Sequence, residues 1–168
     1  MKFSKEKGKL LFMKKSIRDE MINRLEFFLG KWEIEVIHPH FQTNSIYGQT
    51  KFDWMEREKF MVQRTSINQS EFPSSTIVYD YDSNSGTYLQ HYFDSRGVTR
   101  LYNMSFENNY WKVWRDTSDF SQLDFYQRFV GEINESGDTI QCSWETSHDG
   151  SHWEHDFRLI YRKVIQKT

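Results

Sequence analysis

The chain has almost no cysteine, little proline and no long apolar segment. Of its 168 residues only one, Cys142, is cysteine, and only two are proline. A lone cysteine excludes an internal disulfide, so a reducing cytoplasm is the expected location. No segment approaches the roughly 18 consecutive apolar residues of a membrane span. We therefore expect no membrane insertion.

The chain also lacks a strong charge of either sign. It has 22 Lys and Arg against 24 Asp and Glu, a formal net charge of −2. Nucleic-acid binding needs a basic field that displaces counterions, so we expect no nucleic-acid partner. Residues 1–15 differ from the rest, because six lysines against one glutamate give them a local charge of +5. We expect 1–15 to be a disordered basic arm and 16–168 to form one domain.

Aromatic residues, in contrast, are abundant. There are 14 Phe, 9 Tyr and 6 Trp, which make up 17% of the chain. Large flat side chains are favoured in strands and line cavities. The composition therefore predicts a β-rich protein with a substantial core.

Hydrophobic spacing predicts one helix followed by strands. Ile17, Met21, Leu25 and Phe28 recur at helical intervals, and Gly30 is a typical left-handed stop. These features predict a helix over 17–29. From residue 31 the period changes to two, and further strands are expected at 46–55, 59–67, 75–81, 87–94, 98–106, 110–117, 122–133, 138–147 and 152–164.

Turn residues separate these strands, and no long helix lies between them. Segments such as 82–86, 94–97, 135–138 and 148–151 are rich in Asp, Ser, Asn and Gly. Hairpins joining about ten strands describe an all-β, up-and-down antiparallel barrel. The N-terminal helix is expected to cap one end, because closing the sheet leaves only its mouths uncovered.

Several motifs resemble those of a known superfamily. Gly30-Lys31-Trp32, directly after a short helix, resembles the Gly-x-Trp signature of the calycins, the lipocalins and fatty-acid-binding proteins. The segments 60–64, 94–98, 111–115, 144–145 and 149–162 are similar to a group of small bacterial lipocalin-like proteins that have no assigned activity. The resemblance covers roughly residues 25–164. It implies a barrel around a ligand cavity.

The resemblance also implies how the barrel closes. In the lipocalin pattern an Arg from the last strand covers the first-strand Trp, and Arg162 is the best match to that Arg, with Arg158 second. Trp32 and Arg162 would then be structural, with the cation stacked on the indole. The chain lacks the cysteine pair of many secreted lipocalins and the Arg-x-Tyr ending of fatty-acid-binding proteins, so their ligands are not carried over.

Alternation along each strand predicts the inward face of the barrel. We take the more apolar face as inward, although a shift of one residue would invert any strand. The predicted lining is Trp32, Ile34, Val36, Phe52, Trp54, Phe60, Val62, Arg64, Arg100, Tyr102, Met104, Trp111, Val113, Arg115, Phe125, Gln127, Phe129, Cys142, Trp144, His155, Phe157, Leu159 and Tyr161.

Arginines recur on this otherwise apolar face. A buried guanidinium needs a partner, because an unpaired buried charge costs several kcal/mol. Arg64, Arg100 and Arg115 either reach solvent, or pair with acids such as Asp94, Asp116 or Asp156, or hold a ligand. On the last reading, the barrel binds a small, partly apolar ligand that is anionic or carries a carbonyl. The candidate ligand-binding residues are Arg64, Arg100, Tyr102, Arg115, Gln127, Trp144 and His155.

Histidines raise two alternatives to simple binding. His155 falls on the predicted inward face, where it could act in isomerase- or cyclase-type acid–base chemistry or serve as an axial haem ligand. No common catalytic motif is present, so enzyme activity is left open with a preference against it, and no cofactor is expected apart from that haem possibility. The spacing of His148, His152 and His155 does not favour a metal site, because residues three apart in a strand face opposite sides. Tyr110 and Trp114 could pair subunits in a homodimer.

Overall fold

The computed structural model describes residues 17–40 and 46–165. The predicted basic arm lies outside the described residues. A helical segment comprises an α-helix at 17–23 and a 3-10 helix, η1 (Arg24–Phe28). The strands are β1 (Gly30–Ile37), β2 (Ile46–Met55), β3 (Phe60–Ile67), β4 (Ser75–Asp82), β5 (Thr87–Asp94), β6 (Thr99–Glu107), β7 (Tyr110–Arg115), β8 (Tyr126–Ile133), β9 (Thr139–Ser147) and β10 (Glu154–Lys163).

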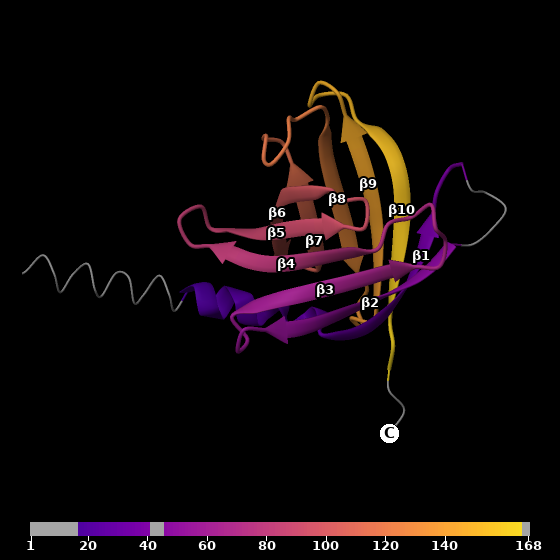
Figure 1. Cartoon of the computed structure of the whole chain (residues 1–168). Helices are drawn as coiled ribbons and strands as arrows, with labels where there is room; N and C mark the ends of the chain where they lie inside the picture. The colour runs from indigo at the N-terminus through magenta and orange to yellow at the C-terminus, as the bar shows by residue number, and fades with distance from the viewer. Residues whose placement is uncertain (1–16, 41–45, 166–168) are drawn as a thin grey trace, which may run out of the picture.

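The strands form a closed antiparallel barrel, as the sequence predicted (Figure 1). Each strand pairs with its neighbours in the chain, and β1 closes the barrel against β10. Because the barrel is up-and-down, β1, β3, β5, β7 and β9 all end at the same mouth, where the even-numbered strands begin. Side chains at those strand ends therefore lie close together, although they are far apart in the sequence.

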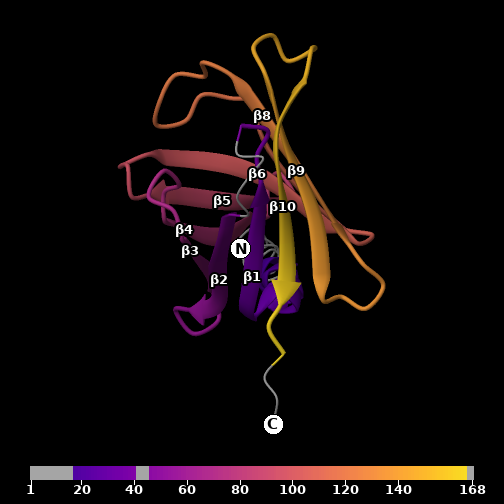
Figure 2. The ribbon, with the colours of Figure 1, turned by 90° about the vertical axis from the view of Figure 1, so that its right-hand side faces the viewer.

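The helical segment covers the opposite mouth (Figures 1 and 2). Ile22, Leu25 and Phe28 are fully buried against the barrel, whereas Ile17, predicted to share the apolar face, is 47% exposed. The phenolic hydroxyl of Tyr88 donates a 2.6 Å hydrogen bond to a backbone carbonyl of the helix. Gly30, the first residue of β1, has a positive φ of 106°, a conformation that favours glycine.

The end of the helix is fixed by two side chains of the closing strands. The last carbonyls of a helix lack partners within it. Trp32 Nε1 donates to the carbonyl of Phe28 at 2.7 Å, and Lys163 Nζ donates to the carbonyl of Phe27 at 3.0 Å. The Lys163 ammonium also lies 5.2 Å from the centre of the Trp32 ring.

Lys163 thus occupies the place predicted for Arg162. The register of β1 and β10 puts Lys163 opposite Trp32, and neighbouring residues of a strand point to opposite faces. Arg162 therefore points outward, where it pairs with Glu35 at 2.9 Å. Trp32 thus contacts the Phe28 carbonyl and Lys163, and the predicted contact between Arg162 and the Trp32 ring is wrong.

The barrel interior is divided into a packed end and an open end. Next to the helix, the ring of Phe28 contacts those of Phe52, Phe106 and Trp111, with centroids 4.9 to 5.3 Å from its own. The solid core therefore fills the helix end of the barrel. Within residues 17–40 and 46–165, no helix is long and apolar enough to cross a membrane.

Candidate functional site

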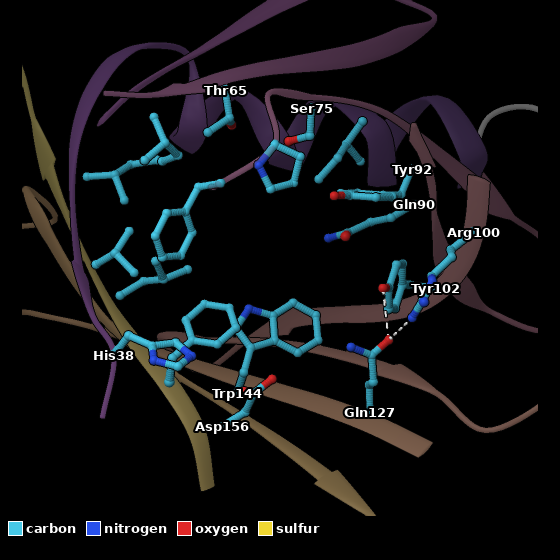
Figure 3. A pocket seen from close by; sticks show the side chains of 18 of the residues that line it. His38, Thr65, Ser75, Gln90, Tyr92, Arg100, Tyr102, Gln127, Trp144 and Asp156 are labelled. Carbon is cyan, nitrogen blue, oxygen red and sulfur yellow. Dashed lines mark hydrogen bonds between the residues drawn. The ribbon is translucent and has the colours of Figure 1, made fainter. Parts of the chain in front are cut away.

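A cavity of about 670 Å³ occupies the end of the barrel away from the helix (Figure 3). Its wall comes from strand ends and loops that the sequence separates widely. The lining residues include His38, Gln63, Thr65, Phe72, Ser75, Gln90, Tyr92, Arg96, Arg100, Tyr102, Phe125, Gln127, Trp144, His148, Asp156, Phe157, Leu159 and Tyr161. Aromatic rings make up much of the wall, with a few polar groups between them.

One polar cluster joins β6 to β8 across the mouth. Arg100 Nη1 donates to Gln127 Oε1 at 2.7 Å, and the Tyr102 hydroxyl donates to the same oxygen at 3.0 Å. Arg100 and Tyr102 are two residues apart on β6, so they share the inward face. Figure 3 shows the three side chains converging on one side of the cavity. Burial raises the pKa of Tyr102, which keeps its hydroxyl protonated as a donor.

Arg100 carries a charge that the barrel does not neutralise. Its guanidinium lies 5.2 Å from the Phe125 ring and bonds the neutral amide of Gln127. Among the described residues no carboxylate forms an ion pair with it. A guanidinium has five N–H donors, and Gln127 accepts from only one of its nitrogens. None of the remaining donors is used by a carboxylate of the described residues, so the guanidinium can bind an anion or a carbonyl oxygen.

The other arginine of the lining is already paired. Arg96 Nη2 lies 2.6 Å from Asp94 Oδ2, and the same carboxylate accepts a hydrogen bond from the Tyr92 hydroxyl at 2.9 Å. Although burial opposes ionisation of Asp94, these bonds lower its pKa to about 2. The Arg96–Asp94 pair is therefore ionised and self-contained at neutral pH, which distinguishes Arg96 from Arg100.

Trp144 forms a flat part of the wall. Its ring centroid lies 5.9 Å from Tyr102, 5.1 Å from Phe129 and 6.5 Å from Phe157. These contacts hold the indole in place beside the Arg100 cluster. A planar apolar group in the cavity would find an ordered aromatic surface there.

Polar side chains that strand alternation did not predict also lie deeper in the barrel. The Tyr79 hydroxyl donates to Gln63 Oε1 at 2.6 Å, and Gln63 Nε2 donates to Thr65 Oγ1 at 3.4 Å. Thr65 Oγ1 is 2.7 Å from Thr50 Oγ1, which in turn donates to the Arg64 carbonyl. Each of these side chains has a hydrogen-bond partner within the protein, so the series of bonds stabilises the barrel wall.

These internal hydrogen bonds explain why the predicted inward position of Arg64 is wrong. The apolar-face rule put Phe60, Val62 and Arg64 inward, but Met61, Gln63 and Thr65 face the interior instead. Arg64 is exposed on the outer surface, and Phe60 lies under the guanidinium of Arg18 at 4.9 Å. The rule failed on β3 because its inward face is polar and its outward face is covered by another side chain.

Arg115 is buried, as expected for an inward residue, but it does not line the cavity. Only 2% of its side chain is exposed, and Asp119 binds it through two hydrogen bonds of 2.9 and 3.1 Å. Asp119 also accepts from the backbone N–H of Leu101 at 2.9 Å. The pair thus fastens the β7–β8 loop to β6. Arg115 is a structural residue and not the predicted ligand contact.

His155 is exposed, contrary to the predicted inward face. The register of β10 against β9 shifts between His155 and Phe157, which marks a β-bulge. A bulge inserts an extra residue and breaks the alternation of faces. Phe157, Leu159 and Tyr161 therefore line the cavity as predicted, together with Asp156, while His155 does not. The acid–base and haem alternatives both lose the residue on which they depended.

The structure places four of the seven candidate ligand-binding residues on the cavity wall. These are Arg100, Tyr102, Gln127 and Trp144. Arg64, Arg115 and His155 are elsewhere. Gln63, Gln90 and Asp156 were missed. In the part of the chain that the structure describes, no group of three His, Cys, Asp or Glu side chains could hold a metal ion.

Comparisons with known proteins add a likeness in structure. No protein-family model matches the sequence, and no curated protein matches it. The crystal structure of Rv2717c from M. tuberculosis superposes with a TM-score of 0.58 at 10% sequence identity. The match covers 86% of this chain and 97% of that one. It shows the fold alone. The fold is consistent with the calycin-like barrel that the sequence motifs implied.

Proposed function

We propose that this calycin-like barrel binds a small, partly apolar ligand whose anionic or carbonyl group contacts Arg100. The observation that carries the proposal is the cavity of about 670 Å³ with an unneutralised guanidinium on its wall. Ligand pockets typically combine apolar walls with a few convergent polar groups. Aromatic surface from Trp144 would contact the body of the ligand, and Arg100 would orient its polar end.

The proposal differs from a purely structural reading of the barrel. Core packing alone accounts for the helix end, where the rings are in contact, but it leaves the other end hollow. An arginine bonded to a neutral amide leaves a net positive charge on the cavity wall, whereas an arginine paired with a carboxylate does not. Arg115 shows that this chain can pair a buried arginine with an acid. Arg100 is left available, which supports a role in binding.

Fluorescent dyes test the proposal. The anionic dye is 8-anilinonaphthalene-1-sulfonate, and N-phenyl-1-naphthylamine is its uncharged counterpart. We expect both dyes to bind with enhanced emission. The variant Arg100→Met should weaken binding of the sulfonate dye by about ten- to hundredfold, since a hydrogen bond to a charged group contributes about 1.5–3 kcal/mol. It should leave the uncharged dye unaffected.

Arg64→Met is the matched control, because Arg64 is an exposed arginine on the outside of the same barrel. It should change neither affinity. Three results would contradict the proposal: no binding of either dye, equal weakening of both dyes by Arg100→Met, or an equal loss of sulfonate binding in the Arg64 variant. Each would mean that the cavity or its guanidinium does not bind the anion.

A further inference from the structure

Gln90 on β5 is a buried amide that the protein leaves partly unused. Only 3% of its surface is exposed. Figure 3 shows its side chain extending from the wall into the cavity. Its Nε2 lies 3.2 Å from Met104 Sδ, a weak acceptor. Among residues 17–40 and 46–165, no donor reaches its Oε1.

The second buried amide of the barrel makes the contrast clear. Gln63, which is 2% exposed, uses both amide atoms: Oε1 accepts from Tyr79, and Nε2 donates to Thr65. The protein itself thus satisfies both amide atoms of Gln63. Gln90 Oε1, in contrast, is not sealed in the core, because it opens into the cavity, where a donor on a bound molecule could reach it.

Gln90 and Arg100 lie at different depths of the barrel, on the neighbouring strands β5 and β6. In the β5–β6 register Gln90 is opposite Tyr102, while Tyr92 is opposite Arg100. Gln90 is thus two residues from the level of Arg100, a step of about 7 Å along the barrel. Met104, the other contact of Gln90, is fully buried toward the helix end. Gln90 marks the deeper position, and Arg100 the position nearer the mouth.

We propose that Gln90 and Arg100 form a two-point site for a flat, conjugated acid with a hydrogen-bond donor at its far end. This inference rests on the proposed function and specifies its ligand class. The acid or carbonyl end lies at Arg100, the ring system lies along Trp144, and a hydroxyl or N–H at the inner end donates to Gln90 Oε1. The Gln90 carboxamide is uncharged and cannot neutralise a cation, so we expect the donor of the ligand to be neutral.

Three naphthoates test this site by isothermal titration calorimetry. They are 6-hydroxy-2-naphthoate, 6-methoxy-2-naphthoate and 2-naphthoate, which share the acid and the rings but differ in the donor. We expect the wild-type protein to bind the hydroxy compound about tenfold more tightly than the methoxy compound, as one hydrogen bond to a buried acceptor allows. This comparison requires no variant.

Variants then locate the donor contact. Gln90→Met removes the amide at similar size, so it should abolish the preference for the hydroxyl and leave binding of 2-naphthoate unchanged. Ser75→Ala alters another polar residue of the lining and should retain the preference. Thermal unfolding and circular dichroism check that both variants fold.

Each result bears on the inference in a defined way. It is overturned if wild-type protein does not distinguish the hydroxy compound from the methoxy compound, or if the preference survives in Gln90→Met. If Arg100-dependent binding of the sulfonate dye persists in those cases, the proposed function stands without this ligand class. If neither the dyes nor the naphthoates bind, the proposed function and the inference both fail.

Discussion

Three arginines of similar sequence context have three different environments. Arg64 is exposed, Arg115 is paired with Asp119 in the interior, and Arg100 faces the cavity with a neutral partner. All three alternate with aromatic or apolar residues on the same predicted strand face, so the strand pattern does not separate them. What separates them is whether a carboxylate from another segment can reach the guanidinium. For a single arginine, the presence of such a carboxylate indicates a structural role, and its absence on the cavity wall favours a role in binding.

The Arg115–Asp119 pair makes stability depend on pH. Hydrogen bonds from the Arg115 guanidinium, and then from backbone N–H groups, hold the pKa of Asp119 well below its usual range. A carboxyl with a depressed folded-state pKa stabilises the protein above its unfolded pKa of about 4, and the contribution is lost as the pH falls through the folded pKa. Between about pH 5 and pH 2, the wild-type protein should therefore lose more unfolding free energy than Asp119→Asn.

Urea unfolding measured across this range checks the prediction. At pH 7, Asp119→Asn should cost about 3–5 kcal/mol, because it leaves the Arg115 charge buried without its partner. Asp116→Asn, an exposed acid of the same loop, should change stability by less than about 0.5 kcal/mol. Parallel pH profiles for the wild type and Asp119→Asn would show that the pair does not contribute this dependence.

At the scale of the element, the helical segment closes one mouth of the barrel. Phe28 is its central contact, fully buried and surrounded by the rings of Phe52, Phe106 and Trp111. Its carbonyl also accepts the hydrogen bond from Trp32. Because the helix and the closing strands meet at this residue, its side chain joins the helix to the core.

Phe28→Ala should therefore destabilise the protein by about 3–5 kcal/mol, the usual cost of removing a buried aromatic ring. Phe120→Ala is the control, because Phe120 is 67% exposed and its loss should cost less than about 0.5 kcal/mol. The difference is measured by urea unfolding at neutral pH. Equal effects of the two substitutions would show that the helix does not contribute to the core in this way.

Local patterns predicted the elements well, because alternation and turn residues act over short distances. Gly30 ends the helix, and most strand bounds agree within one or two residues. The exception is the β7–β8 loop, where Asp119 folds back onto Arg115 and Leu101, so that β7 ends at residue 115 and β8 begins at 126. The contact with Leu101 joins residues 18 apart in the sequence, and the alternation of residues within one strand cannot predict it.

The candidate site was harder to predict than the strands. Arg100, Tyr102 and Trp144 reached the cavity wall by simple alternation. His155 did not, because a bulge in β10 shifts the register, and no residue of that segment marks the bulge. On β3 the assumption that the apolar face is inward failed, because Gln63 and Thr65 bond one another inside the barrel. Where the interior is polar, the more apolar face of a strand can point outward, opposite to the assumption behind the prediction.

At the scale of the whole molecule, the barrel has one closed and one open end. The helix and its aromatic core close the first, while the cavity of about 670 Å³ occupies the second. Because the strands run alternately up and down, every hairpin at the open end adds residues to one rim. The fold thus gathers Arg100, Gln127 and Trp144 from three strands at one place, and it leaves Gln90 beneath them.

The most direct test of this arrangement is a crystal structure of the wild-type protein with 8-anilinonaphthalene-1-sulfonate. We expect the dye inside the barrel, with its sulfonate oxygens within about 3 Å of the Arg100 guanidinium and its rings against Trp144. A dye bound only on the outer surface, with the barrel interior unoccupied, would contradict it.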